Sequence, residues 1–336
     1  MTEREDLIEE FLARAGWRGA ARTKLAADAS FRRYERLEDG PRRAILMDAP
    51  PPHEDVRPFV SVQRLLAALG LSVPAILARD VERGCLLLED FGDGTYTRLL
   101  AAGESELELY ALAVDVLIEL HRRIGPADGL SLRRYDEAAL LDEAVRLLDW
   151  YLPAMTGAPT SPPLRGSYLD LWHGLLPAAL SVPQTLVLRD YHVDNLMRLE
   201  GRDGIAACGL LDFQDAVLGP ISYDLMSLLE DERRDVPADL QRRMIARYVD
   251  AVPDLDRNAF AASYAVLGAQ RHCKNIGQFA RLLVRDGKPH YLRHLPRMWR
   301  LLEEDFRHPA LAPLAEWFAA HIPPGLRGIP PVRSAA

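Results

Sequence analysis

The features that most constrain the fold of this chain are three polar residues placed around one predicted pair of strands. Asp190 follows a hydrophobic run at residues 185–188 that predicts a buried strand, and Asn195 comes five positions later. Hydrophobic residues resume at 196–197, and a further run ends at Asp212. Because turn residues join these last two runs, the sequence predicts a strand pair that carries Asn195 and Asp212 directly after the Asp190 loop.

These three side chains are the groups that phosphoryl transfer requires. The reaction needs a carboxylate that orients or deprotonates the attacking hydroxyl, and oxygen ligands that hold Mg²⁺ against the phosphates. We expect Asp190 to be the catalytic base. Asn195 and Asp212 are the expected Mg²⁺ ligands, because hard oxygen donors suit that ion. A lone Asp after a strand is more often structural, so the prediction depends on all three residues. For Asp215, a structural role and a second metal contact are both open.

Composition and charge narrow the class of partner. The chain has 336 residues, enough for two domains, and its hydrophobic fraction of 49% is ordinary for a globular protein. A net charge of −8 gives no basic footprint for nucleic acid. No apolar run reaches the roughly 18 residues of a membrane span. Three widely spaced cysteines, Cys85, Cys208 and Cys273, predict reduced thiols in a cytoplasmic protein. The expected partner is a small molecule, and the oligomeric state stays open.

Periodicity divides the chain into a strand-rich N-terminal part and a helical C-terminal part. Residues 1–92 carry five predicted strands and one inserted helix at 59–69. Residues 93–321 are expected to be mostly helical, and residues 322–336 to form a loosely held tail rich in Pro and Gly. The strands are expected within 26–37, which reads as strand, turn and strand, and at 44–47, 76–78 and 85–88.

One candidate for holding a nucleotide is the turn at residues 28–34. Its backbone N–H groups, together with Ser30, Phe31 and Arg33, are placed to approach phosphates, although the turn lacks a Gly-rich pattern. The alternative is that Arg32 and Arg33 are solvated charges on a strand.

A second candidate follows the last N-terminal strand. The Asp-Phe-Gly sequence at 90–92 imitates the metal-binding triplet of protein kinases, but it precedes Asp190 by 100 residues instead of following it. We interpret this segment as a hinge in which backbone groups near Glu89 and Phe91 pair with adenine. Its acidic side chains are expected to be solvated or capping rather than catalytic.

Further short sequences accompany these motifs. The Asp190 loop and the Asp212 strand are followed by Gly-Pro at 219–220 and Tyr-Asp-Leu at 223–225. In this combination the chain resembles the aminoglycoside phosphotransferase (choline kinase-like) superfamily over roughly residues 20–300.

The resemblance implies an α+β, protein-kinase-like fold of two lobes. A small N-terminal lobe with an antiparallel sheet would span residues 1–92, and a larger, mostly helical lobe would follow. The resemblance also implies ATP as the phosphate donor and Mg²⁺ as its partner ion. Asp190 then takes the role of the base, and Asn195 and Asp212 take the metal roles.

Additional segments carry a narrower resemblance. They read ADASFRRY at 27–34, LMDAPP at 46–51, QRH at 270–272, FAR at 279–281 and DGKP at 286–289. They resemble the anomeric N-acetylmuramate/N-acetylglucosamine kinases of bacterial cell-wall recycling, which implies transfer to the C1 hydroxyl of a free amino sugar in peptidoglycan recycling. The alternatives are a kinase for another hydroxyl, such as choline or an aminoglycoside, and a degenerate kinase fold that only binds nucleotide.

One departure from the superfamily concerns a lysine. The third N-lobe strand usually carries a Lys that contacts the nucleotide phosphates, whereas residues 45–48 read ILMD, with Met47 in the run. Arg33 or Arg43 can substitute for it, or Mg²⁺ can carry the charge alone. The predicted helix at 59–69 also has no Glu that would pair with such a lysine.

The acceptor pocket is expected from residues 140–175 and from the helices after Asp224. Arg271, His272 and Lys274 are tentative substrate contacts, because a cation there would suit the lactyl carboxylate of N-acetylmuramate. The alternative is that these residues form a solvated helix face.

Overall fold

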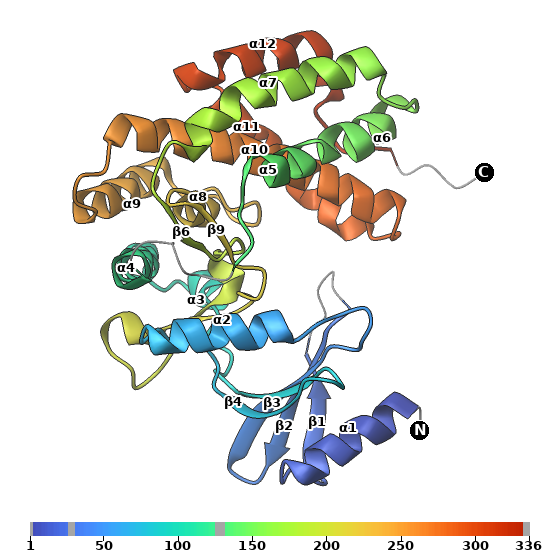
Figure 1. The fold of residues 1–336 in the computed structure, drawn as a ribbon, viewed down its shortest axis with the longest axis vertical. Helices are drawn as coiled ribbons and strands as arrows, with labels where there is room; N and C mark the ends of the chain where they lie inside the picture. The colour runs from blue at the N-terminus through green and yellow to red at the C-terminus, as the bar shows by residue number, and fades with distance from the viewer. Residues whose placement is uncertain (1–2, 26–30, 125–131, 332–336) are drawn as a thin grey trace. The chain divides into compact units, whose positions relative to one another are not determined.

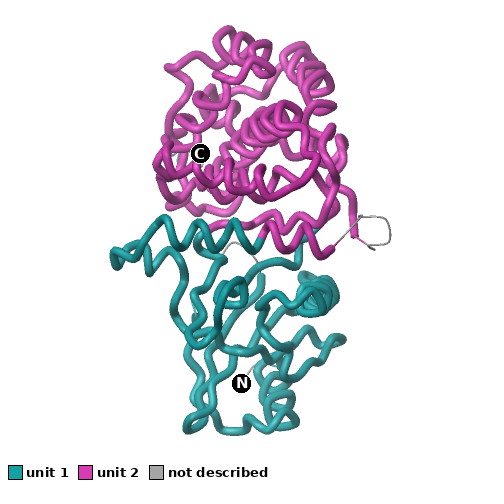
Figure 2. The backbone as a smooth tube through the Cα atoms, turned by 90° about the vertical axis from the view of Figure 1, so that its left-hand side faces the viewer, with its two compact units in different colours: residues 1–116, 193–216 teal, residues 117–192, 217–336 magenta. Residues whose placement is uncertain are grey.

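The structure, a computed structural model, describes residues 3–25, 31–124 and 132–331. Its contacts separate two compact units, which Figure 2 draws in different colours. Unit 1 comprises Met1–Val116 and Val193–Ala216, and unit 2 comprises Leu117–His192 and Val217–Ala336. No described helix combines the length and the apolar composition that crossing a membrane would need.

A five-stranded antiparallel sheet forms the centre of unit 1 (Figure 1). In spatial order its strands are β1 (Ala21–Lys24), β2 (Arg33–Asp39), β3 (Arg42–Asp48), β5 (Cys85–Glu89) and β4 (Ile76–Asp80). β5 is buried over most of its length because it is a continuous apolar run. The predicted strands at 44–47, 76–78 and 85–88 are confirmed. Residues 26–30, which include the predicted Ser30 turn, lie outside the described residues.

The core of unit 1 lies between this sheet and the first helix, α1 (Glu3–Arg14). The helix has an apolar stripe at spacing i, i+3 and i+4, which is typical of a helix with one buried face. The stripe packs with side chains of β2, β3 and β5 in one cluster of Ile8, Phe11, Leu12, Trp17, Leu37, Ala44, Leu46, Cys85 and Leu87.

A two-stranded hairpin of β7 (Leu196–Arg198) and β8 (Cys208–Leu210) also belongs to unit 1. The Leu210 N–H donates to the Ser72 carbonyl at 2.8 Å, and Ser72 bridges Gly209. The remaining helices of this unit are α2 (Arg57–Ala68) and α3 (Tyr96–Ala101). The sequence suggested a lobe boundary at residue 92, whereas these contacts, which join segments far apart in the chain, extend unit 1 beyond it.

Unit 2 is mostly helical, as expected. Its antiparallel strands β6 (Gln184–Val187) and β9 (Val217–Pro220) pair with one another. Its helices are α4 (Glu106–Ile124, which begins in unit 1), α5 (Glu137–Ala144), α6 (Leu152–Thr156), α7 (Pro162–Leu180), α8 (Tyr223–Leu229), α9 (Ala238–Ala251), α10 (Arg257–Val284), α11 (Leu295–Asp305) and α12 (Ala312–His321).

Helix α10 is the central element of the unit 2 core. Asp256 caps its start by accepting the N–H groups of Asn258 and Ala259 at 2.9 and 3.0 Å. Further along, Gly277 lies against the backbone that leads into the π-helical turn Leu147–Tyr151. A Cβ atom on Gly277 would meet the carbonyl carbon of Arg146 at 2.2 Å, so the two backbones approach closely only because this residue has no side chain.

The C-terminal segment makes specific contacts, although the sequence predicted a loosely held tail. The Tyr151 hydroxyl donates to the Leu326 carbonyl at 2.7 Å and accepts the Gly328 N–H at 2.8 Å. Arg327 donates to the Ile322 carbonyl at 2.8 Å. A Pro- and Gly-rich composition therefore does not prevent order here, because side chains elsewhere bind the backbone.

We predict that Gly277→Ala destabilises the protein, because the new methyl group would collide with backbone atoms. The expected loss in unfolding free energy is about 1–3 kcal/mol, the usual cost of overpacking a core. Gly174→Ala on α7 is the matched control, because no atom lies within 4 Å of its Cβ position. The control should stabilise the helix by up to about 1 kcal/mol. Urea and thermal unfolding midpoints measure both changes, and equal midpoints would contradict the close approach.

Candidate active site

Asn195 and Asp212 lie at adjacent ends of the hairpin in unit 1. Asn195 directly precedes β7, and Asp212 comes two residues after β8. The Leu211 N–H donates to the Asn195 carbonyl at 2.9 Å, which joins the two positions. Asp212 has a φ of 57°, in the left-handed region that non-Gly residues seldom occupy. Such backbone strain is common at functional sites.

These two residues fit a magnesium site. Their side chains offer one amide oxygen and one carboxylate, both partly exposed, and hard oxygen ligands are the ones that Mg²⁺ takes. Gln214 Nε2 donates to Asp212 Oδ1 at 2.8 Å and to Asp215 Oδ2 at 3.3 Å. The second interaction links Asp215 to the same group of side chains, without deciding between the two roles expected for it.

Asp190 lies in unit 2, in a turn that a buried carboxylate holds. Asp224, near the start of α8, accepts the N–H groups of Leu188 and Arg189 at 2.6 and 2.9 Å. Arg189 has a φ of 71°, so the chain turns sharply before Asp190. Burial raises the pKa of Asp224 to about 7, although these two backbone donors act in the opposite direction. From the sequence, Asp224 was identified only as part of a motif, and its role in holding the Asp190 turn was not predicted.

The Asp190 side chain is 39% exposed and faces a buried cation. Arg271 Nη2 lies 3.6 Å from Asp190 Oδ1. Burial raises the pKa of Asp190, but Arg271 and then Lys274 outweigh it and hold this pKa below its usual value. Asp190 is therefore a carboxylate at neutral pH, able to accept a hydrogen bond or a proton from a hydroxyl.

Arg271 joins the Asp190 turn to helix α10. Its side chain is only 3% exposed. Nη1 donates to the Arg189 carbonyl at 3.0 Å and to the Tyr223 hydroxyl at 3.1 Å, and Nη2 lies 3.9 Å from Glu232. The solvated helix face, considered from the sequence, is therefore wrong at Arg271.

A second buried group of charges centres on Glu143. Lys274 Nζ lies 3.1 Å from Glu143 Oε2, and Arg189 binds the other carboxylate oxygen at 2.5 Å. Burial raises the pKa of Glu143, but Lys274 and Arg189 lower it to about 2. Lys274 thus neutralises a core carboxylate that no sequence pattern identified, because both of its cationic partners are more than 40 residues away from it.

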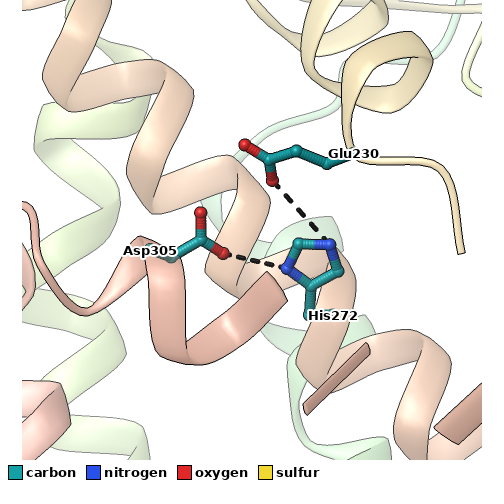
Figure 3. A group of neighbouring side chains, drawn as sticks. All are labelled: Glu230, His272 and Asp305. Atoms are coloured by element: carbon teal, nitrogen blue, oxygen red, sulfur yellow. Dashed lines mark hydrogen bonds and ion pairs between the residues drawn. The ribbon is translucent and has the colours of Figure 1, made fainter. Parts of the chain in front are cut away.

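His272 takes part in a third buried group, shown in Figure 3. Its Nδ1 lies 2.9 Å from Asp305 Oδ2, and its Nε2 lies 3.8 Å from Glu230 Oε2. Burial lowers the pKa of His272 and raises those of both carboxyl groups well above their usual values. An imidazole with two carboxylates is a possible metal donor set. The two carboxyl groups, however, each face a different ring nitrogen (Figure 3), and only Asp305 is within hydrogen-bond distance of the imidazole.

The three tentative substrate residues Arg271, His272 and Lys274 are therefore all buried. Their closest described partners are protein groups, and direct contact with a sugar stays a prediction.

The predicted hinge residues lie at the end of β5. Glu89 accepts the Ala75 N–H at 3.1 Å, and the guanidinium of Arg202 lies over the Phe91 ring at 5.3 Å.

The remaining nucleotide candidates lie in unit 1. Phe31 is 65% exposed, and its ring stacks on His53 with centroids 5.0 Å apart. Arg33 is exposed at the first position of β2. Ser30 lies outside the described residues. Nucleotide contacts by these residues stay predictions.

The site and fold define a phosphotransferase. Residues 22–261 match the model of the phosphotransferase enzyme family, and the chain belongs to this family. The chain is similar to the N-acetylmuramate/N-acetylglucosamine kinase of Caulobacter vibrioides, at 37% identity over 96% of this chain and 98% of that protein. The kinase of the same name from Pseudomonas aeruginosa is 39% identical over 94% of each chain.

Solved structures show the same fold at low sequence identity. A choline/ethanolamine kinase family protein from Mesorhizobium loti has a TM-score of 0.64 at 14% identity, covering 94% of this chain and 98% of that one. An ADP-bound aminoglycoside phosphotransferase has a TM-score of 0.61 at 15% identity, covering 90% and 98%. These matches confirm the expected α+β, protein-kinase-like fold.

We predict that Glu143→Gln destabilises unit 2, because it leaves Lys274 and Arg189 as buried cations without their carboxylate. Breaking a buried pair typically costs about 3–5 kcal/mol. Glu137→Gln, on the same helix, is the control, because the Glu137–His173 pair is exposed and should contribute less than about 1 kcal/mol. Urea unfolding at neutral pH compares the two.

The same substitution should change the acid sensitivity of the fold. The lowered pKa means that Glu143 contributes its stability above the ordinary glutamate value of 4.5, and that this contribution is lost as the pH falls towards about 2. The Gln variant should therefore lose less stability over that range than the wild type. Parallel pH curves for the two proteins would contradict the assignment.

Proposed function

We propose that this protein is an ATP-dependent sugar kinase that phosphorylates the anomeric C1 hydroxyl of N-acetylmuramate and N-acetylglucosamine, in peptidoglycan recycling. The observation that carries the chemistry is the ionised, half-buried carboxylate of Asp190 beside buried Arg271. The named relatives, at 37% and 39% identity over nearly the whole chain, support the choice of sugar.

Asp190 accepts the proton of the C1 hydroxyl in this proposal. The C1 oxygen forms a bond to the γ-phosphorus of ATP, the bond from that phosphorus to the bridging oxygen breaks, and ADP leaves. The products are a sugar 1-phosphate and ADP, with the proton held on Asp190 until it passes to solvent. Arg271 keeps Asp190 charged before the reaction and holds the carbonyl of the preceding residue.

Asn195 and Asp212 would hold Mg²⁺, which when bound neutralises charge on the phosphates. In the sequence these two residues follow Asp190 by 5 and 22 positions. Phe31, Arg33, Glu89 and Phe91 belong to the proposed nucleotide site.

The test of the substrate is ADP release with Mg-ATP against N-acetylmuramate, N-acetylglucosamine, choline and kanamycin, followed by ³¹P NMR of the product. We expect turnover with the two amino sugars and a phosphate coupled to an anomeric proton. Turnover with choline or kanamycin alone would keep the phosphotransferase chemistry and overturn the proposed sugar. Binding of ATP without turnover would favour the nucleotide-binding alternative.

We predict that Asp190→Asn lowers kcat by about 10²–10⁴-fold, the usual contribution of a general base. Binding of Mg-ATP should be unchanged, because the amide keeps the size of the side chain. Asp203→Asn, at an exposed position of the β7–β8 connection, is the control and should retain full activity. Steady-state kinetics with a thermal unfolding midpoint for each variant makes the comparison. Wild-type kcat in a folded Asp190→Asn protein would remove Asp190 from the mechanism.

A further inference from the structure

Residues 45–48 of strand β3, where the resemblance to the superfamily implies a lysine, contain no cation. Met47 is 1% exposed, within β3, and pairs with Tyr34 of β2 and Leu86 of β5. It is an apolar core residue of the sheet. Under the proposed function, the negative charge of a nucleotide triphosphate then has to be met by a cation from another element.

The two replacements considered from the sequence are poorly placed for this role. Arg43 is 61% exposed and pairs with Glu38 of the neighbouring strand at 3.1 Å. Arg33 is exposed at the start of β2, where it lies opposite Asp48. Among the described residues, neither arginine forms an ion pair with the carboxylate of Asp212.

Arg32 does contact that carboxylate. Its Nη1 lies 3.5 Å from Asp212 Oδ1, and its Nη2 lies 3.8 Å from Asp215 Oδ2. The Arg32 side chain is 15% exposed, so it is held in place rather than extended into solvent. All three residues belong to unit 1, and their arrangement is therefore a property of a single compact unit.

Glu54 fixes the position of Arg32 from the other side. One of its carboxylate oxygens accepts from Arg32 Nε at 3.2 Å, and the other accepts the backbone N–H of Phe31 at 3.1 Å. A single carboxylate thus binds both the side chain of Arg32 and the backbone beside it. The predicted helix at 59–69 contains no Glu, and Glu54 precedes helix α2, which begins at Arg57.

We propose that Arg32, positioned by Glu54, is the cation that binds the β- and γ-phosphates of the nucleotide in place of the missing lysine. This inference rests on the proposed function, in which Asp212 would hold Mg²⁺ and the ion would neutralise phosphate charge. A guanidinium that contacts the carboxylate of Asp212 lies within reach of the same phosphates, and its planar donors suit phosphate oxygens. Glu54 holds Nε, and the terminal N–H groups of Arg32, which here pair with Asp212 and Asp215, would exchange these carboxylates for phosphate oxygens.

The test measures nucleotide binding in the absence of sugar by titration calorimetry, with Mg-ADP and a non-hydrolysable Mg-ATP analogue. Arg32→Gln should raise the Kd for both by about 10- to 100-fold, the effect of losing a hydrogen bond from a charged group to phosphate. The affinity for adenosine, which has no phosphate, should be unchanged. Arg32→Lys should recover part of the affinity. Arg42→Gln, whose exposed side chain pairs with Asp39 on the same sheet, is the matched control and should bind as the wild type does.

Glu54→Gln tests the positioning role separately. It should raise the KM for ATP by about 3- to 10-fold while leaving the KM for the sugar unchanged, because Arg32 keeps its charge but loses its fixed orientation. Wild-type affinity for Mg-ADP in Arg32→Gln, or an equal loss of adenosine affinity, would overturn the proposal. The failure of the proposed function is a different result, namely a wild-type protein that binds Mg-ATP in the Arg32-dependent way but phosphorylates neither amino sugar.

Discussion

The buried carboxyl group of Asp224 fixes the turn that carries Asp190, the proposed catalytic base. It accepts two successive backbone N–H groups, those of Leu188 and Arg189, at the point where Arg189 adopts a left-handed conformation. Such a conformation costs about 1–3 kcal/mol for a residue with a side chain, so the surrounding bonds have to maintain it. Because they do, β6 ends in a sharp turn, and the next residue, Asp190, presents a half-buried carboxylate.

Buried cations then set the charge state of that carboxylate. Burial alone would favour a neutral Asp190, yet Arg271 and Lys274 reverse the effect. The cations are in turn stabilised by carboxylates of their own, since Glu143 binds Lys274 and Glu232 lies near Arg271. Buried ion pairs of this kind contribute little net stability, but removing one partner is costly. Through Arg271 and Lys274, these groups hold the pKa of Asp190 below its usual value.

The proposed functional groups could be predicted from the sequence because their spacing is local. Asp190, Asn195 and Asp212 lie within 23 positions of one another, and the strand patterns around them are regular. Alternation and apolar runs also located most of the N-terminal sheet. Chemistry that depends on a strand end or a hairpin can therefore be predicted from one chain.

The supporting residues could not be predicted in the same way. Arg271 meets Asp190 across 81 positions, and Arg32 meets Asp212 across 180. Tertiary packing brings these residues together, and no periodicity in the sequence indicates these contacts. For the same reason, the polar stretch around Arg271 was equally compatible with a solvated helix face. Glu54 was not predicted because it lies outside the predicted helix at 59–69, where a Glu that pairs with a lysine was expected.

Arg271 is proposed to keep the carboxylate of Asp190, the proposed catalytic base, charged. The most direct test compares the pH dependence of kcat/KM for the wild type and for Arg271→Gln. The acid limb of the wild-type profile should lie below the ordinary aspartate pKa, and the variant's acid limb should move to higher pH, because the largest of the charges that oppose the effect of burial on the pKa of Asp190 is then absent. A folded Arg271→Gln enzyme with the wild-type acid limb would contradict it.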